Sequence, residues 1–276
     1  MTLVRDESGR LHIETLLMAE SLMDKALLES TETEQVFRPL PDLNVIKLGG
    51  QSIIDRGSGT LMPLLKEIVA ARPKHPMLLM TGGGTRSRHA YAIALDLGMP
   101  TGVLAKLGAS ISEQNALMVS ILLAPYGGSK IAHDDIVKLP SYLAMGTIPV
   151  MHAMPPYGLW ETPPPRGRIP PHRTDVGAFL TAEVVGARRC ILVKDERGLL
   201  TADPKKDPAA HFIEEIEVGE LQQMDLADLP VERALLDYLG RSRSVREVLL
   251  VNGREPGNLT RALQGENPGT RIYREG

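Results

Sequence analysis

The strongest constraint on the fold is an alternation of short apolar segments with segments of helical periodicity. Residues 43–48 read as a first buried strand, residues 59–71 as a helix and residues 77–80 as a second strand. Glycines and a helix over about 86–97 follow this second strand. Signals in this order are typical of βαβ units, so we predict an α/β fold with a mainly parallel sheet and helices on both of its faces.

The same alternation continues to the C-terminus, where one loop interrupts it. Residues 154–171 are rich in proline, which excludes regular structure and predicts an unusually long loop. The sequence contains no repeat and no low-complexity linker, which favours one continuous sheet over independent domains. The remaining predicted helices cover about 112–123, 175–185 and 230–239, the strands cover about 147–151, 190–193 and 247–251, and a last helix and strand lie within 259–272.

An N-terminal extension precedes the fold. Apolar residues recur at near-helical spacing over about 13–28, and a proline-containing stretch at 37–41 then breaks the pattern. We therefore predict a helical extension over residues 1–40, which packs on the body or on a neighbouring subunit. Residues 41–276 are predicted to form a single domain.

Composition narrows the classes of function. With 31 basic against 34 acidic side chains, the chain lacks the positive charge that neutralises a phosphate backbone, so we expect no nucleic-acid partner. We expect no membrane partner either, because no run approaches the ~20 apolar residues of a membrane span, and the N-terminus is too acidic for a signal peptide. Cys190 is the single cysteine, which excludes an internal disulfide and predicts a buried thiol in a cytoplasmic protein.

Two glycine-rich turns stand at the C-terminal ends of predicted strands, where open α/β sheets bind their ligands. Gly49 and Gly50 follow the first strand and its Lys47. The second strand is followed by Gly82, Gly83 and Gly84. Glycines let backbone amides approach a phosphate and a lysine adds positive charge, so the two turns together predict a phosphate site. Each turn alone also reads as a plain tight turn, and neither matches a Walker P-loop or the dinucleotide fingerprint.

Charged residues stand at the starts of two predicted helices. Residues 172–175, with the sequence His-Arg-Thr-Asp, open one of them, where Thr174 or Asp175 would cap the first turn. In a second interpretation, Asp175 faces Lys47 and fixes the lysine and Mg²⁺ for in-line phosphoryl transfer. Arg86 and Arg88 begin the other helix, where their charge opposes the helix dipole, and this predicts a bound anion nearby.

Five ordered motifs over residues 43–272 resemble the amino-acid kinase superfamily, especially its uridylate-kinase branch. They are Lys47-Leu48-Gly49-Gly50, Gly82-Gly83-Gly84, Thr174-Asp175, residues 198–204 and Val251-Asn252-Gly253. The resemblance implies a three-layer αβα fold, an ATP site at the C-terminal edge of the sheet with a nucleotide-binding C-terminal lobe, and commonly a hexamer.

The same resemblance implies a role for each matched residue. Lys47 contacts the transferred phosphate, the glycines of both turns hold the phosphates of ATP, and Asp175 orders the catalytic charges. The residues implied around the adenosine are Lys194, Gly198, Thr201, Asp203 and Pro204.

The chain departs from uridylate kinases where the monophosphate acceptor binds. Arg88 matches the arginine that contacts the acceptor phosphate in that branch, but Ala105 stands where a ribose-binding aspartate is expected. The acceptor loop, here residues 169–175, is also replaced, and it follows the long proline-rich segment. An acceptor other than UMP is therefore implied.

Residues 85–89, 154–160 and 169–179 are instead similar to subunits of the molybdenum storage type. Such subunits form uridylate-kinase-like hexamers that use ATP to deposit molybdate or tungstate as polyoxometalate clusters in a closed cavity. Residues 159–160 and 193–196 resemble the β type of subunit, whereas His133 and His172 resemble the α type. A further histidine-rich stretch of the α type is missing.

Histidines are the candidate residues for binding the metal oxyanion. The resemblance favours His133 and His172, with His89 and His152 as further candidates. Molybdate is a phosphate-sized dianion, which arginines and protonatable histidines can hold. The four histidines show no zinc-type spacing, and each also reads as an ordinary surface or core histidine.

From these observations we predict a storage-type subunit that binds and hydrolyses ATP to deposit molybdate or tungstate. The expected assembly is a hexamer, of this chain alone or with a sister subunit. Two alternatives stay open: a uridylate or other small-molecule kinase, and a catalytically silent ATP-binding subunit with a structural or regulatory role. Intact Lys47 and Asp175 argue against a silent subunit.

Overall fold

The computed structural model describes residues 3–275 apart from 6, 10, 14, 15, 19–21, 33–35 and 203–208. It divides into two compact units, Met1–Phe37 and Arg38–Gly276. The first unit contains an antiparallel pair of strands, β1 (Leu3–Arg5) and β2 (Leu11–Ile13), a 3-10 turn over Leu16–Met18, and the short helix α1 (Lys25–Ser30).

The continuous helix predicted over residues 13–28 is wrong. Ile13 ends β2, and residues 22 and 23 form a turn, so α1 begins only at Lys25. Asp24 sets this start, because its side chain caps the helix by accepting a hydrogen bond from the Leu27 amide. Exposed large apolar residues described in this unit are Val4, Leu11, Leu16, Leu17, Leu22, Met23, Leu28 and Phe37. The expected packing of the extension on the body or on a neighbouring subunit stays a prediction.

The second unit is built on an eight-stranded, mainly parallel sheet, which confirms the predicted α/β fold. The strand order is β10-β12-β11-β7-β3-β4-β6-β5. Strands from β11 to β5 are parallel, and β12 pairs antiparallel with β11. The strands are β3 (Asn44–Leu48), β4 (Met77–Thr81), β5 (Gly128–Lys130), β6 (Ile148–His152), β7 (Arg189–Lys194), β10 (Glu215–Glu217), β11 (Glu247–Asn252) and β12 (Thr270–Tyr273). A separate antiparallel pair joins β8 (Leu199–Leu200) to β9 (Phe212–Ile213).

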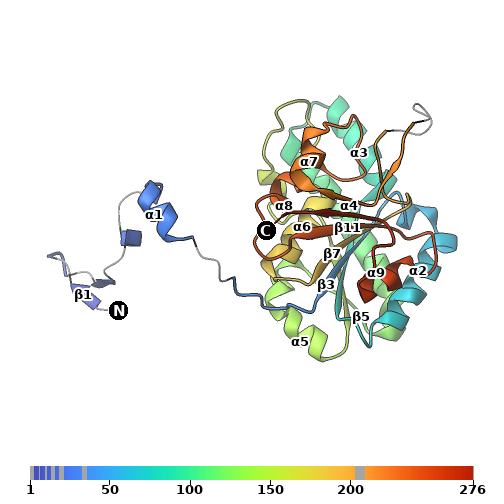
Figure 1. The fold of residues 1–276 in the computed structure, drawn as a ribbon, viewed down its shortest axis with the longest axis horizontal. Coiled ribbons are helices and arrows are strands. Elements are labelled where there is room, and N and C mark those ends of the chain that lie inside the picture. The colour runs from blue at the N-terminus through green and yellow to red at the C-terminus, as the bar shows by residue number, and fades with distance from the viewer. Residues whose placement is uncertain are drawn as a thin grey trace. The chain divides into compact units, whose positions relative to one another are not determined.

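Helices cover both faces of the sheet, as Figure 1 shows. One face holds α2 (Ser58–Ala71), α4 (Thr101–Leu123) and α9 (Asn258–Gln264), and the other holds α5 (Leu139–Ala144), α6 (Thr174–Val184), α7 (Val218–Gln223) and α8 (Arg233–Leu239). Successive residues of β3 serve opposite faces, since Val45 packs in the α6 cluster and Ile46 in the α2 cluster. The sheet is therefore the middle of three layers. Cys190 of β7 is a buried free thiol, as predicted.

Helix α4 begins at Thr101, but the sequence predicted a helix only from residue 112, so its first half was missed. Gly102 and Gly108 lower the helix propensity of this half, yet both are required by close contacts. A Cβ on Gly102 would collide with the Leu159 carbonyl oxygen, and a Cβ on Gly108 would collide with the Tyr91 hydroxyl of α3 (Gly84–Asp96). The glycines therefore mark where the proline-rich loop and α3 approach the backbone of α4.

Within the described residues, α4 is also the helix long and apolar enough, by composition, to cross a membrane. Its inner face, with Val119 and Leu123, is buried against the sheet. Ser112 and Asn115 of the same helix donate hydrogen bonds to the carbonyls of Thr81 and Gly82. Core helices of α/β folds pass the same test of length and composition, so α4 is weak evidence for a membrane span.

We expect Phe179 to be a main contributor to stability. It is the largest fully buried side chain and lies in the core between α6 and the sheet. Replacing it with alanine removes its apolar contacts and leaves a cavity, so Phe179→Ala should lower the free energy of unfolding by about 3–5 kcal/mol. The exposed Val137 is the control, and Val137→Ala should change the free energy of unfolding by less than about 0.5 kcal/mol. Urea denaturation measures both values, and equal losses of unfolding free energy in the two variants would contradict the assignment of Phe179 to the core.

Candidate functional site

The site lies at β3, where the strand order of the sheet reverses. From β3 the chain passes to β4 and β6 on one side and later returns to β7 and β11 on the other. Ligands of open α/β sheets bind at such a reversal, beyond the C-terminal ends of the strands. Lys47 of β3, the glycine turn after β4 and Lys194 at the end of β7 are brought together there.

The two glycine turns predicted from the sequence are in backbone contact. A Cβ on Gly50 would collide with the amide nitrogen of Gly84, and a Cβ on Gly82 would lie 2.8 Å from the Gly50 amide nitrogen. The same Cβ on Gly82 would be 3.4 Å from Cε of Lys47. Side chains would force the turns apart, so the glycines are what bring two amide-rich segments beside one ammonium group. This arrangement suits the phosphates of a nucleotide.

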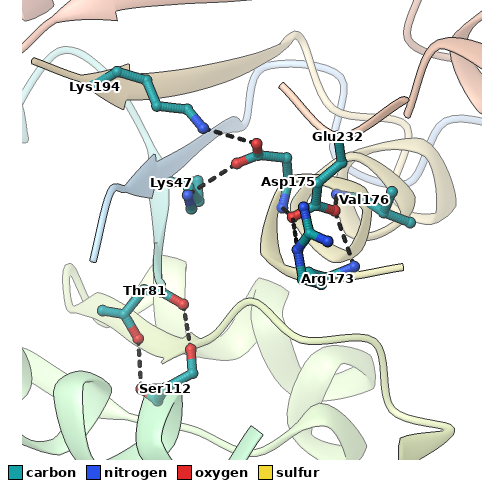
Figure 2. A network of polar contacts seen from close by, with 8 residues as sticks. All are labelled: Lys47, Thr81, Ser112, Arg173, Asp175, Val176, Lys194 and Glu232. Atoms are coloured by element: carbon teal, nitrogen blue, oxygen red, sulfur yellow. Dashed lines mark hydrogen bonds and ion pairs between the residues drawn. The ribbon is translucent and has the colours of Figure 1, made fainter. Parts of the chain in front are cut away.

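Asp175 lies between two lysines, as Figure 2 shows. Its Oδ1 is 2.9 Å from Nζ of Lys47, and its Oδ2 accepts a 2.7 Å hydrogen bond from Nζ of Lys194. Burial alone would raise the pKa of Asp175, but the charges of Lys194 and Lys47 outweigh burial and hold this pKa far below its usual range. Asp175 is therefore a fixed anion that orients two ammonium groups toward one space.

The cap of α6 differs from the prediction that Thr174 or Asp175 provides it. Arg173 is at the N-cap position and its side chain does not cap the helix. Instead, the carboxylate of Glu232 accepts hydrogen bonds from the amides of Arg173, Asp175 and Val176 at 2.9, 3.1 and 3.1 Å (Figure 2). Sequence reasoning missed Glu232 because no local pattern links it to a helix start so far along the chain. Its cap leaves the Asp175 side chain free to face the lysines.

A cavity of about 760 Å³ opens in front of these groups. Its wall includes residues 228–232, a segment to which the sequence assigned no role. Thr201 lies outside the lining and exchanges backbone and side-chain hydrogen bonds with His211. Asp203 and Pro204 lie outside the described residues. The predicted site residues that line the cavity are Lys47, Gly49, Gly50, Gly82, Gly83, Gly84, Arg88, Asp175, Lys194 and Gly198.

Arg86 and Arg88 have different surroundings, although both were expected near an anion. Arg86 donates hydrogen bonds to the side-chain oxygens of Gln114 and Asn115. Asn115 in turn donates to the Gly82 carbonyl at 2.7 Å. Arg86 therefore supports the second glycine turn from α4, whereas Arg88 lines the cavity.

His133 and His152 form a pair away from the glycine turns. Their ring centroids are 4.3 Å apart at an interplanar angle of 85°. Burial, and next the charge of His133, lower the pKa of His152 to about 4. Nδ1 of His152 is buried and has no hydrogen-bond partner among the described residues. The charge of Glu113 raises the same pKa, and the charges of Lys130 and Lys106 lower it.

The other two candidate histidines lie elsewhere. Nδ1 of His172 is 2.8 Å from Oε1 of Glu161, and its Nε2 is 3.2 Å from the Tyr238 hydroxyl, so both ring nitrogens have partners. His89 is exposed on α3. In the part of the chain that the structure describes, no group of three or more His, Cys, Asp or Glu side chains is placed to hold a metal ion.

Comparison with known proteins identifies the class to which this fold and site belong. Residues 42–245 match the amino acid kinase family. The chain therefore belongs to this family. The glycine turns, Lys47 and Asp175 had already indicated a resemblance to it.

Within the family, the chain is similar to the molybdenum storage protein subunit beta of Azotobacter vinelandii. The two are 50% identical over 260 residues, which cover 94% of this chain and 96% of that subunit. The uridylate kinase of Thermofilum pendens is 30% identical over 81% of this chain and 94% of its own length. Crystal structures of uridylate kinase from Archaeoglobus fulgidus and UMP kinase from Bacillus anthracis share the fold. Their TM-scores are 0.64 and 0.65, their identities are 22% and 18%, and the matches cover 83% and 86% of this chain and 99% and 98% of theirs.

The lowered pKa of His152 predicts a loss of stability in acid. Its folded-state pKa of about 4 lies below the unfolded value of about 6.5, so the unfolded chain binds this proton first as the pH falls. The free energy of unfolding should therefore drop between pH 6.5 and pH 4, by on the order of 2–3 kcal/mol from this residue. His152→Phe keeps a ring beside His133 and should flatten the pH dependence. Urea denaturation at pH 7, 6 and 5 measures the effect, and parallel curves for both proteins would contradict it.

Proposed function

We propose that this chain is a storage-type subunit that binds MgATP and uses its hydrolysis to deposit molybdate or tungstate. The buried Lys47–Asp175–Lys194 array beside two touching glycine turns is the observation that supports the ATP site. The 50% identity with a molybdenum storage protein subunit supports the oxyanion cargo.

The residues of the site fit the phosphates of ATP and the charge changes of their transfer. ATP, with Mg²⁺ on its phosphates, would supply the phosphoryl group. The amides of Gly50 and Gly84 would hold the phosphates, and Lys47 would stabilise charge that grows on the transferred oxygens. Because both oxygens of Asp175 are engaged by lysines, its part in our proposal is to orient them. Mg²⁺ would be held by the phosphates and by Asp195 or Glu196, which line the cavity.

The acceptor side of the cavity fits an anion better than a nucleoside. Arg88 and Arg173 line it and can hold an oxyanion. Ala105, where uridylate kinases are expected to have a ribose-binding aspartate, is buried in an apolar cluster with Ala109 and Met154. Ribose hydroxyls would find no hydrogen-bond partner in this cluster, which supports an acceptor other than UMP.

The pair His133 and His152 is our proposed contact for the stored oxyanion. It combines a buried ring nitrogen that lacks a partner among the described residues with Lys106 and Lys130 nearby. Burial lowers the pKa of both histidines, so the pair alone is neutral, and a bound dianion would favour its protonation. His89 and His172 stay further candidates, although His172 would have to give up Glu161 or Tyr238.

Assembly into a hexamer, with copies of this chain or with a sister subunit, is part of the proposal. An exposed apolar face on α4 supports a subunit contact, as does the proline-rich loop with its exposed Trp160. The exposed residues of the α4 face are Leu117, Met118, Ile121 and Leu122, with Tyr126 just beyond. A cytoplasmic location stays a prediction.

A uridylate or other small-molecule kinase is the second candidate, which the 30% identity with a uridylate kinase favours. A silent ATP-binding subunit is the third, and the intact array of Lys47 and Asp175 argues against it. Robust formation of UDP from UMP in a coupled assay would favour the kinase over the storage subunit.

Lys47→Ala tests the ATP part of the proposal. Loss of a preorganised charge at the transferred group typically costs about 3 kcal/mol, so phosphate release should fall roughly a hundredfold while ATP affinity changes far less. Metal loading that depends on hydrolysis should stop as well. Phosphate release, ATP affinity and molybdenum content are measured side by side, with Lys66→Ala on the exposed face of α2 as the control.

Unchanged phosphate release in Lys47→Ala would remove this lysine from catalysis. Unchanged metal loading despite lost hydrolysis would show that ATP is a structural ligand and that the oxyanion enters without it.

His133→Phe tests the proposed cargo contact. The substitution keeps an aromatic ring against His152 but removes both ring nitrogens, so metal retained after gel filtration should fall severalfold while phosphate release stays near the wild-type rate. His75 precedes β4 at the N-terminal ends of the strands, opposite the proposed site, and provides the control substitution His75→Phe. Equal metal content in His133→Phe, His75→Phe and the wild type would contradict the assignment.

A further inference from the structure

Glu232 is a buried carboxylate that joins two parts of the cavity. It directly follows residues 228–231, which line the cavity as Glu232 itself does. Its side chain reaches the N-terminus of α6, which carries Asp175. Although Glu232 is at the N-cap position of α8, its side chain does not cap that helix.

Both carboxylate oxygens of Glu232 accept hydrogen bonds from backbone amides at the start of α6. Oε2 accepts from the amides of Arg173 and Val176, and Oε1 accepts from the amide of Asp175. Oε1 also lies 3.7 Å from Nε of Arg173. The amides of Arg173, Asp175 and Val176 are therefore satisfied by the chain itself. The backbone of Asp175 is held by one carboxylate, while its side chain is held by Lys47 and Lys194.

The charge of Glu232 is disfavoured at this buried position, which suggests that its contact with α6 has a function. Burial raises the pKa of Glu232, and the nearby Asp175 raises it further, against the opposing charge of Arg173. Two buried carboxylates thus lie at one helix end, where each disfavours the charge of the other. A neutral side chain with an acceptor oxygen would avoid this repulsion.

We propose that Glu232 is a positioning residue that couples the cavity wall at 228–231 to Asp175. A nucleotide that packs against this wall fixes Glu232, and the shared amides then fix Asp175 between Lys47 and Lys194. Occupancy of the site and the alignment of the phosphate-facing lysines are in this way one event. The inference rests on the proposed ATP site and adds to it the route by which occupancy orders the charges.

Glu183, which lies on α6 itself, provides a matched control. Glu183 accepts hydrogen bonds from the amides of Arg243, Ser244 and Val245 at 2.6, 2.8 and 2.7 Å. It is near the C-terminal end of α6 and outside the cavity lining. Glu183 and Glu232 therefore each satisfy three backbone amides, but Glu232 alone of the two lies at the cavity.

The test compares Glu232→Gln, Glu232→Asp and Glu183→Gln with the wild type. Glutamine keeps the size of the side chain but turns an NH₂ group toward backbone N–H groups, so it cannot cap all three amides. Aspartate keeps the charge on a stem that is one methylene shorter. Amide hydrogen exchange is followed for peptides that cover residues 173–176 and 228–232, with and without MgATP, together with kcat and KM for ATP.

MgATP should slow exchange in both segments of the wild type and of Glu183→Gln. In Glu232→Gln it should slow exchange at 228–232 but not at 173–176, and kcat should fall roughly tenfold to a hundredfold with a much smaller change in KM. Glu232→Asp should be intermediate in both measurements, and it provides the test if Glu232→Gln does not fold.

Two results separate the failure of this inference from the failure of the proposed function. Protection at 173–176 in the Glu232 variants equal to that of the wild type would overturn the coupling and leave the ATP site intact. Absence of MgATP protection in the wild type at both segments would overturn the ATP site itself, and the coupling with it.

Discussion

The burial of Asp175 between Lys47 and Lys194 is the interaction on which the site depends. A buried carboxylate is tolerated when opposite charges and hydrogen bonds compensate it, and here the two lysines come from adjacent parallel strands. Lys47 of β3 is in register with Leu192 of β7, so Lys194 lies two positions nearer the C-terminal edge. Alternation along each strand turns both lysines to the face that α6 covers. The sheet register thus fixes a charge arrangement that no single segment could make.

The remaining parts of the site follow from that arrangement. The reversal of strand order at β3 opens space beyond the strand ends, and the contact between the two glycine turns brings amides to that space. Glu232 then satisfies the start of α6 from a distant segment, which keeps Asp175 aimed at the lysines rather than at its own helix. Asp175 is held by lysine side chains and Glu232 by backbone amides, and both carboxylates lie behind the phosphate-binding surface that we propose.

Local patterns in the sequence predicted the six inner strands of the sheet and most of its helices, but not the edge strands β5 and β10. Strand periodicity and glycine position predicted β3, β4 and the two turns, because both signals are local. The start of α4 was missed because Gly102 and Gly108 lower helix propensity for the sake of tertiary contacts. The cap from Glu232 could not be predicted, since it joins residues far apart in the chain. The helix predicted over residues 13–28 was wrong for a different reason. Helical spacing of apolar residues does not exclude a turn, and residues 22 and 23 form one directly before Asp24 caps α1.

A storage subunit and a nucleotide kinase can share every element of the fold and of the phosphate site, so the cargo decides between them. The most direct measurement is elemental analysis of the full chain, purified without chelators from cells supplied with molybdate or with tungstate, together with its bound nucleotide. Our account predicts more than one metal atom per chain that survives gel filtration, with ATP or ADP in the same fractions. Metal-free protein under both conditions, combined with efficient conversion of UMP to UDP, would contradict it.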